Sequence, residues 1–156
     1  MDPKLLVASN LDSLGETRQM MEGEARINNG VDVQPRRGRI LVIDDEVAVG
    51  RTLNRLLGSQ HDVTVVSDGR QALDLFAGGA HFDVIICDLT MPELSGMDIY
   101  EHCQKQKPEL AERFVFMTGG TFTTASREFL DSVSNVFIEK PFDLQTVRHI
   151  VQSRIG

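Results

Sequence analysis

The chain is poor in cysteine, in basic residues and in long hydrophobic runs, and each shortage excludes a class of protein. Its 156 residues include only two cysteines, Cys87 and Cys103, which are too few for a disulfide framework. No apolar run approaches the roughly 18 residues of a membrane-spanning helix, which excludes a transmembrane protein. Sixteen lysines and arginines against 23 aspartates and glutamates leave a net charge of −7, which repels the phosphate backbone of nucleic acids. We therefore expect no direct binding to nucleic acid and no association with a membrane.

The N-terminus lacks the basic start, apolar core and small-residue cleavage site of a secretory leader. Together with the scarcity of cysteine, this predicts a cytoplasmic protein. The length suits one domain with a short appendage. Residues 1–38 carry scattered hydrophobic residues and, over 28–38, many turn-forming residues. We therefore expect an N-terminal extension or linker over 1–38 and a domain over 39–156.

From residue 39 onward, two kinds of segment alternate along the chain. Short apolar runs rich in β-branched and aromatic residues predict strands, and amphipathic stretches between them predict helices. The expected strands cover 40–43, 63–66, 84–87, 114–117 and 136–138, and the expected helices lie near 49–57, 72–77, 97–103, 129–133 and 144–151. Strict alternation with continuously apolar strands predicts an α/β domain, a doubly wound five-stranded parallel sheet with helices on both faces.

Polar residues follow four of the five predicted strands, at the point where each strand ends. The first strand runs into Asp44, Asp45 and Glu46, and the third runs into Asp88. The remaining two are followed by a hydroxyl and a lysine: Thr118, and Lys140 before Pro141. Open parallel sheets bind ligands beyond the carboxyl ends of their strands, so we expect these side chains to share one edge of the sheet.

Several carboxylates at one edge would repel one another. Two unit charges about 4 Å apart at an effective dielectric constant of about 20 interact by roughly 4 kcal/mol. Lys140 supplies one positive charge, and an acidic, oxygen-rich site suits a hard divalent cation such as Mg²⁺. A raised pKa on one carboxyl group is the alternative. A single aspartate after a strand commonly caps a helix or forms a turn, but four polar strand ends together favour a binding site.

These residues resemble the receiver domain of two-component response regulators. The loop over 88–96 matches that family's pattern Asp-x-x-Met-Pro-x-x-x-Gly without a gap. The resemblance covers about residues 39–155 and implies a flavodoxin-like sheet with strand order 2-1-3-4-5. The acidic pair, the phosphoacceptor, the switch hydroxyl and the lysine–proline pair of the family correspond, in chain order, to Asp44 and Asp45, Asp88, Thr118, and Lys140 and Pro141.

The resemblance implies a role in phosphorelay signal transduction. Asp88 would accept a phosphoryl group from a phosphohistidine with the help of Mg²⁺ or Mn²⁺, and the conformational switch would control a partner protein. Asp45, Asp88 and the backbone carbonyl of Thr90 would hold the metal, with Asp44 assisting through water. Lys140 would contact a phosphoryl oxygen. Such a domain is a phosphoacceptor that assists its own phosphorylation and dephosphorylation rather than an enzyme.

The resemblance also implies how the phosphoryl group is sensed. The Thr118 hydroxyl would donate a hydrogen bond to it, and Phe137 would swing inward when the threonine moves. The alternative for Phe137 is a plain core residue of the fifth strand. Pro141 would fix its loop through a restricted or cis peptide bond. Thr90 and Gly120 would flank the path of the hydrolytic water and tune the lifetime of the phosphoryl group.

The expected partners are a histidine kinase or a histidine phosphotransfer protein, which would contact residues 47–54, and an unknown downstream protein. The chain would be a monomer or a weak homodimer. Because only Gly156 follows Ile155, we expect no attached output domain, as in a stand-alone regulator or the C-terminal receiver of a hybrid histidine kinase.

Two other interpretations stay open. The first is a magnesium-dependent phosphohydrolase of the haloacid dehalogenase type, which is disfavoured because Asp44-Asp45-Glu46 stands where that family has Asp-x-Asp. The second is a receiver-like module that binds partners without being phosphorylated.

Overall fold

The structure, a computed structural model, describes residues 36–120 and 122–155. Within it, Arg37–Ile155 form one compact unit. The predicted N-terminal extension lies outside the described residues except for 36–38, where Arg37 forms an ion pair with Asp62 at 2.8 Å. In the part of the chain that the structure covers, no helix is long and apolar enough to cross a membrane.

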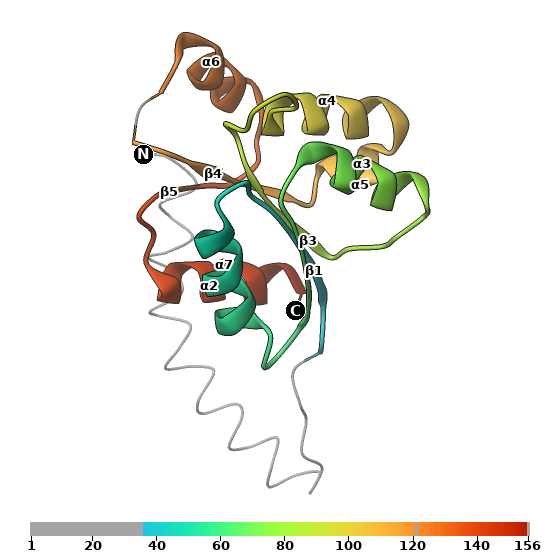
Figure 1. Cartoon of the computed structure of the whole chain (residues 1–156), viewed down its shortest axis with the longest axis vertical. Coiled ribbons are helices and arrows are strands. Elements are labelled where there is room, and N and C mark those ends of the chain that lie inside the picture. The colour runs from blue at the N-terminus through green and yellow to red at the C-terminus, as the bar shows by residue number, and fades with distance from the viewer. Residues whose placement is uncertain (1–35, 121, 156) are drawn as a thin grey trace, which may run out of the picture. The chain divides into compact units, whose positions relative to one another are not determined.

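Five short strands form one parallel sheet in the order β2-β1-β3-β4-β5, which confirms the predicted fold class and strand order (Figure 1). Every residue of β3 and β4 is buried, whereas the edge strand β2 is largely exposed. The continuous burial of the central strands explains why their sequences are apolar throughout rather than alternating. The strands are β1 (Arg39–Ile43), β2 (Asp62–Val66), β3 (Val84–Asp88), β4 (Phe114–Thr118) and β5 (Phe137–Glu139).

Helices cover both faces of the sheet, as parallel crossover connections require. Helices α2 and α7 lie on one face, and α3, α4, α5 and α6 lie on the other (Figure 1). The helices are α2 (Val47–Leu57), α3 (Gly69–Ala77), α4 (Gly96–Gln106), α5 (Pro108–Ala111), α6 (Thr124–Ser132) and α7 (Leu144–Ile155).

Each face of the sheet has its own hydrophobic core. Neighbouring residues of one strand point to opposite faces, so Ile85 belongs to the core beneath α3, α4 and α6, and Ile86 belongs to the core beneath α2 and α7. Both side chains are almost completely buried. We call the core that contains Ile85 the aromatic core, because Phe114, Phe116 and Tyr100 pack edge-on or tilted within it.

Two helical segments differ from the prediction. The fourth helix was expected around Phe129 and Val133, but α6 begins at Thr124, and Val133 already has an extended backbone with φ −114° and ψ 151°. The hydroxyl of Thr123 accepts a hydrogen bond from the Ser126 amide, which fixes the start of α6 at this position. The short helix α5 was not predicted, because its four residues are too few to show helical periodicity.

Candidate functional site

The register of the sheet brings the predicted polar residues to one edge. Ile43 of β1 pairs with Cys87 of β3, so Asp44 and Asp88 follow at the same level of neighbouring strands. Across β3 and β4, Asp88 pairs with Met117, which places Thr118 one residue further along. The Lys140 amide donates to the Thr118 carbonyl at 2.8 Å and so attaches the end of β5 to the same edge.

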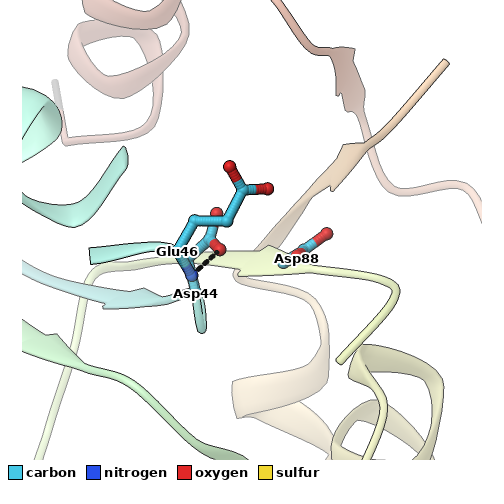
Figure 2. A group of neighbouring side chains, drawn as sticks. All are labelled: Asp44, Glu46 and Asp88. Atoms are coloured by element: carbon cyan, nitrogen blue, oxygen red, sulfur yellow. Dashed lines mark hydrogen bonds between the residues drawn. The ribbon is translucent and has the colours of Figure 1, made fainter. Parts of the chain in front are cut away.

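The ammonium group of Lys140 lies among three carboxylates. Its Nζ is 2.8 Å from Asp44 Oδ2, 3.2 Å from Glu46 Oε1 and 3.4 Å from Asp88 Oδ2. Figure 2 shows the three acidic side chains around the ends of β1 and β3, with the carboxyl group of Glu46 projecting away from the sheet. Of these three contacts, the one with Glu46 is a hydrogen bond, and the other two are ion pairs.

A tight turn after β1 places two of these acids. The Glu46 amide donates to Asp44 Oδ1 at 2.8 Å (Figure 2), and the Glu46 carbonyl accepts from the amides of Val49 and Gly50 at the start of α2. Asp44 is thereby folded inward and buried, whereas the Glu46 side chain is 61% exposed at the solvent side.

Burial governs the charges in this pocket. It raises the pKa of Asp88 to about 6, with a further contribution from the charge of Asp44, while Lys140 acts in the opposite direction. Burial also raises the pKa of Asp44, although Lys140 and the Glu46 amide favour its charged form. Burial alone would lower the pKa of Lys140, but the surrounding carboxylates more than compensate and raise it. Both expected ways of reducing the repulsion between the carboxylates, a raised pKa on one acid (Asp88) and the positive charge of Lys140, are thus present at this edge of the sheet.

The acidic group fits a hard divalent cation. Ligand atoms of Asp44, Glu46 and Asp88 all lie within 4.8 Å of one another. Mg²⁺ prefers oxygen ligands and keeps several waters, so carboxylate oxygens at such spacing suit it. Asp44 Oδ2 is buried and, among the described residues, has no hydrogen-bond partner; the Lys140 ammonium contacts it as an ion pair outside hydrogen-bonding geometry. Such an oxygen has free lone pairs to offer a cation.

Two residues of the predicted metal set stand apart from this group. The Asp45 side chain is exposed and does not belong to the three clustered acids. Thr90 is also exposed, and its amide donates to Asp88 Oδ1 at 3.4 Å, a long contact. The roles of Asp45 and of the Thr90 carbonyl in metal binding stay predictions. Glu46 belongs to the cluster although the resemblance implies no role for it. Its position directly after Asp44 and Asp45 is the feature of the sequence that indicates it.

Of the two residues expected to sense the phosphoryl group, Thr118 directly follows Met117, which pairs with Asp88. Thr118 is 3% exposed, and its Oγ1 has no hydrogen-bond partner among the described residues. A Cβ atom on Gly119 or Gly120 would meet nothing within 4 Å, so there is open space beside the two residues that follow Thr118. Phe137 is half-buried and packs against the aromatic core, and the Lys140–Pro141 peptide bond is cis. The buried Thr118 hydroxyl, which has no partner among the described residues, can still donate a hydrogen bond to a ligand oxygen.

Comparisons with known proteins agree with this geometry. The sequence profile described as the response regulator receiver domain matches residues 40–152. The response regulator MprA of Mycolicibacterium vanbaalenii is 32% identical over 108 residues, which cover 69% of this chain and 46% of the relative. The regulatory protein AtoC of Escherichia coli is 33% identical over 115 residues, which cover 73% of this chain and 24% of the relative.

The fold is also similar to that of solved receiver-domain structures. The receiver domain of the Francisella response regulator 1452 superimposes with a TM-score of 0.61 at 26% identity, and the match covers 74% of this chain and 96% of that domain. By contrast, the chain spans less than half of the length of MprA and about a quarter of that of AtoC. The match of the receiver-domain profile spans the segment that carries Asp44, Asp88, Thr118 and Lys140, and the chain therefore belongs to the receiver-domain family of two-component response regulators.

Proposed function

We propose that this domain accepts a phosphoryl group on Asp88 from the phosphohistidine of a histidine kinase or a histidine phosphotransfer protein, and that it uses Mg²⁺ to do so. One observation carries the proposal: a buried carboxylate at the sheet edge lies 3.4 Å from a lysine ammonium and beside two further acids. This arrangement combines a nucleophile with the charges that phosphoryl transfer requires.

The transfer exchanges one bond to phosphorus for another. A carboxylate oxygen of Asp88 attacks phosphorus, the bond from phosphorus to the imidazole nitrogen breaks, and the imidazole leaves with the electron pair. With its pKa near 6, Asp88 is mostly ionised at neutral pH and can act as the nucleophile. Lys140 then pairs with a phosphoryl oxygen. When bound by Asp44 and Asp88, Mg²⁺ supplies positive charge that offsets the phosphoryl oxygens.

The modified domain would signal through Thr118. Its buried hydroxyl has no partner among the described residues, so a phosphoryl oxygen at Asp88 would give it an acceptor. Movement of Thr118 would be transmitted to Phe137, which packs on the neighbouring strand, and to the surface formed by α6, β5 and α7. A downstream protein would read this surface. The kinase or phosphotransfer protein would dock on residues 47–54, beside the pocket, and both encounters would take place in the cytoplasm.

Intact mass spectrometry tests the proposal. Phosphoramidate has the same phosphorus–nitrogen bond as phosphohistidine, and in the presence of Mg²⁺ it should add one phosphoryl mass to the protein. Asp88→Asn should abolish the addition, whereas Asp45→Asn should reduce it without removing the acceptor. An undiminished addition in Asp88→Asn would refute the assignment. Sustained release of phosphate from many phosphate esters per protein molecule would instead favour a phosphohydrolase.

A further inference from the structure

Glu46 differs from the other two acids around Lys140 in its exposure. The side chains of Asp44 and Asp88 are 0% and 6% exposed, whereas that of Glu46 is 61% exposed. The Glu46 backbone is held by the Asp44 side chain and by the start of α2, so the carboxyl group reaches Lys140 from the solvent side. Glu46 therefore lies on the side from which a phosphodonor must enter the pocket.

Among the described residues, the ammonium group of Lys140 donates one hydrogen bond, to Glu46 Oε1 at 3.2 Å. Its contacts with the two buried acids, 2.8 Å to Asp44 Oδ2 and 3.4 Å to Asp88 Oδ2, are ion pairs without a hydrogen bond. A phosphoryl oxygen that approaches from solvent needs an N–H group of this lysine. The donor directed to Glu46 is the one on its path, and the Glu46 charge also repels an incoming dianion.

We propose that the Glu46 carboxylate is a placeholder for the phosphoryl group, because it occupies the solvent-side donor of Lys140 until a phosphoryl oxygen displaces it. This inference rests on the proposed phosphorylation of Asp88 and adds a control of its rate. Glu46 is a positioning residue that acts through Lys140. An exposed ion pair is weak, so the need to displace Glu46 from Lys140 slows phosphorylation without preventing it.

The test compares Glu46→Gln with Glu139→Gln. Both variants remove one negative charge from an exposed side chain. Glu46 contacts Lys140 directly, whereas Glu139 precedes Lys140 in the sequence and makes no ion pair with it among the described residues. Equal midpoints of urea unfolding would show that both variants are folded. At saturating Mg²⁺, the rate of phosphorylation by phosphoramidate and the affinity for beryllofluoride, a non-transferable phosphoryl mimic, are measured by mass spectrometry and by amide NMR.

Glu46→Gln should raise the rate at low phosphoramidate and lower the apparent Kd for beryllofluoride, each by about threefold to tenfold. Glu139→Gln should change each by less than about twofold. The difference between the variants should shrink as salt is added, because exposed charges are screened. Identical behaviour of the two variants would overturn the proposal.

A second outcome would also overturn it. If Glu46→Gln weakens both Mg²⁺ binding and beryllofluoride binding, Glu46 is a metal ligand and not a placeholder; a titration with Mg²⁺ alone decides this. If the wild-type protein takes no phosphoryl group on Asp88, the proposed function fails. The beryllofluoride comparison then still decides whether Glu46 competes for Lys140.

Discussion

At the scale of single residues, Asp88 shows how a reactive position opposes stability. It is 4% exposed, and burial together with the charge of Asp44 raises its pKa from 3.8 to about 6. The folded protein therefore binds the Asp88 proton more tightly than the unfolded chain does. The stability that this proton contributes is present below about pH 3.8 and is lost as the pH rises through about 6.

We therefore predict that Asp88→Asn stabilises the metal-free protein at pH 8. The neutral amide removes a buried charge, and the gain in the free energy of unfolding should be about 1–3 kcal/mol. The gain should vanish near pH 3.5, where the native carboxyl group is protonated. Urea unfolding in the presence of a chelator measures both values, and the exposed Asp45→Asn serves as the matched control. A variant no more stable than wild type at pH 8 would show that Lys140 fully offsets the buried charge.

His61 has the opposite dependence on pH. It is 4% exposed, and its Nδ1 accepts a hydrogen bond from the Gly38 amide at 3.1 Å, which requires an unprotonated nitrogen. Burial, with a contribution from Arg37, lowers the pKa of His61 below 6.5. The stabilisation from neutral His61 is therefore complete above pH 6.5 and is lost as the pH falls through its lower folded value.

His61→Asn should flatten this part of the stability profile. The asparagine oxygen can replace Nδ1 as the acceptor for Gly38 but cannot be protonated in this range. We expect the variant to lose about 1 kcal/mol at pH 7.5 through altered packing, and to lose less than wild type between pH 7 and pH 5. Thermal unfolding across this range tests the expectation, with the exposed His102→Asn as control. A profile as steep as that of wild type would place the acid sensitivity elsewhere.

At the scale of elements, the loop after β3 and the start of α4 are packed directly against the acceptor. A Cβ atom on Gly96 would lie 2.3 Å from the Asp88 carbonyl oxygen and 2.9 Å from Leu89 Cα. Both are backbone atoms, which cannot rotate out of the way. The glycine at the end of the Asp-x-x-Met-Pro-x-x-x-Gly pattern thus lets α4 begin close behind Asp88, and the capping pair of Ser95 and Asp98 holds it there.

Gly96→Ala should therefore destabilise the fold by about 1–3 kcal/mol, because α4 or the Asp88 peptide must shift. The same shift should slow phosphorylation of Asp88 in the fraction that stays folded. Gly78→Ala at the end of α3 is the matched control, since a Cβ there would make only ordinary contacts at 3.4 and 3.6 Å and Gly78 has no role assigned at the phosphorylation site. Urea unfolding and the mass-based phosphorylation assay give the two readouts. Equal stability of the two variants would mean that the loop accommodates the methyl group freely.

The sequence was sufficient to predict the strands, but not where every helix begins. A run such as 84–87 is apolar at each position because both faces of β3 are covered, whereas a strand or helix with one face in water would show polar residues at regular intervals. Periodicity located the middle of α6 near Phe129 but not its start, because the Thr123 cap is a polar residue outside the apolar pattern. Local hydrogen bonds, rather than hydrophobicity, set that boundary.

The candidate site was predictable to a similar extent. That Asp44, Asp88, Thr118 and Lys140 share one edge follows from the strand ends of a parallel sheet. Which acids in the run 44–46 turn inward does not follow, because it depends on the hydrogen bond from the Glu46 amide to Asp44. This turn buries Asp44, leaves Asp45 exposed and brings Glu46 to Lys140.

At the scale of the whole molecule, one sheet serves two cores. Ile85 and Ile86 are adjacent on β3 and lie on opposite faces, so neither core can loosen without affecting the strand that both share. The single tyrosine of the chain, Tyr100, packs against Phe114 and Phe116 and reports on the aromatic core alone. Tyrosine fluorescence and far-ultraviolet circular dichroism can therefore follow one face and the whole fold separately.

We predict that Ile85→Val and Ile86→Val each cost about 0.5–1.5 kcal/mol and that both shift the two transitions together. Tyr100 should respond to Ile86→Val although this substitution lies on the other face. Urea unfolding followed by both probes measures the shifts, and an unchanged slope would show that the exposed surface is the same. If Ile86→Val left the unfolding transition followed by Tyr100 fluorescence unchanged, the two faces would unfold independently.

The position of Lys140 depends on the shortest strand. β5 has three residues, lies at the edge of the sheet, and aligns with its neighbour through Phe116 and Phe137, Met117 and Ile138, and Thr118 and Glu139. A slip of one residue along β4 would displace the lysine by about 3.3 Å, as far as the ion pairs themselves extend. A partner protein or a mutation that shifts β5 along β4 would therefore move Lys140 away from its three carboxylates, although it contacts none of these acids.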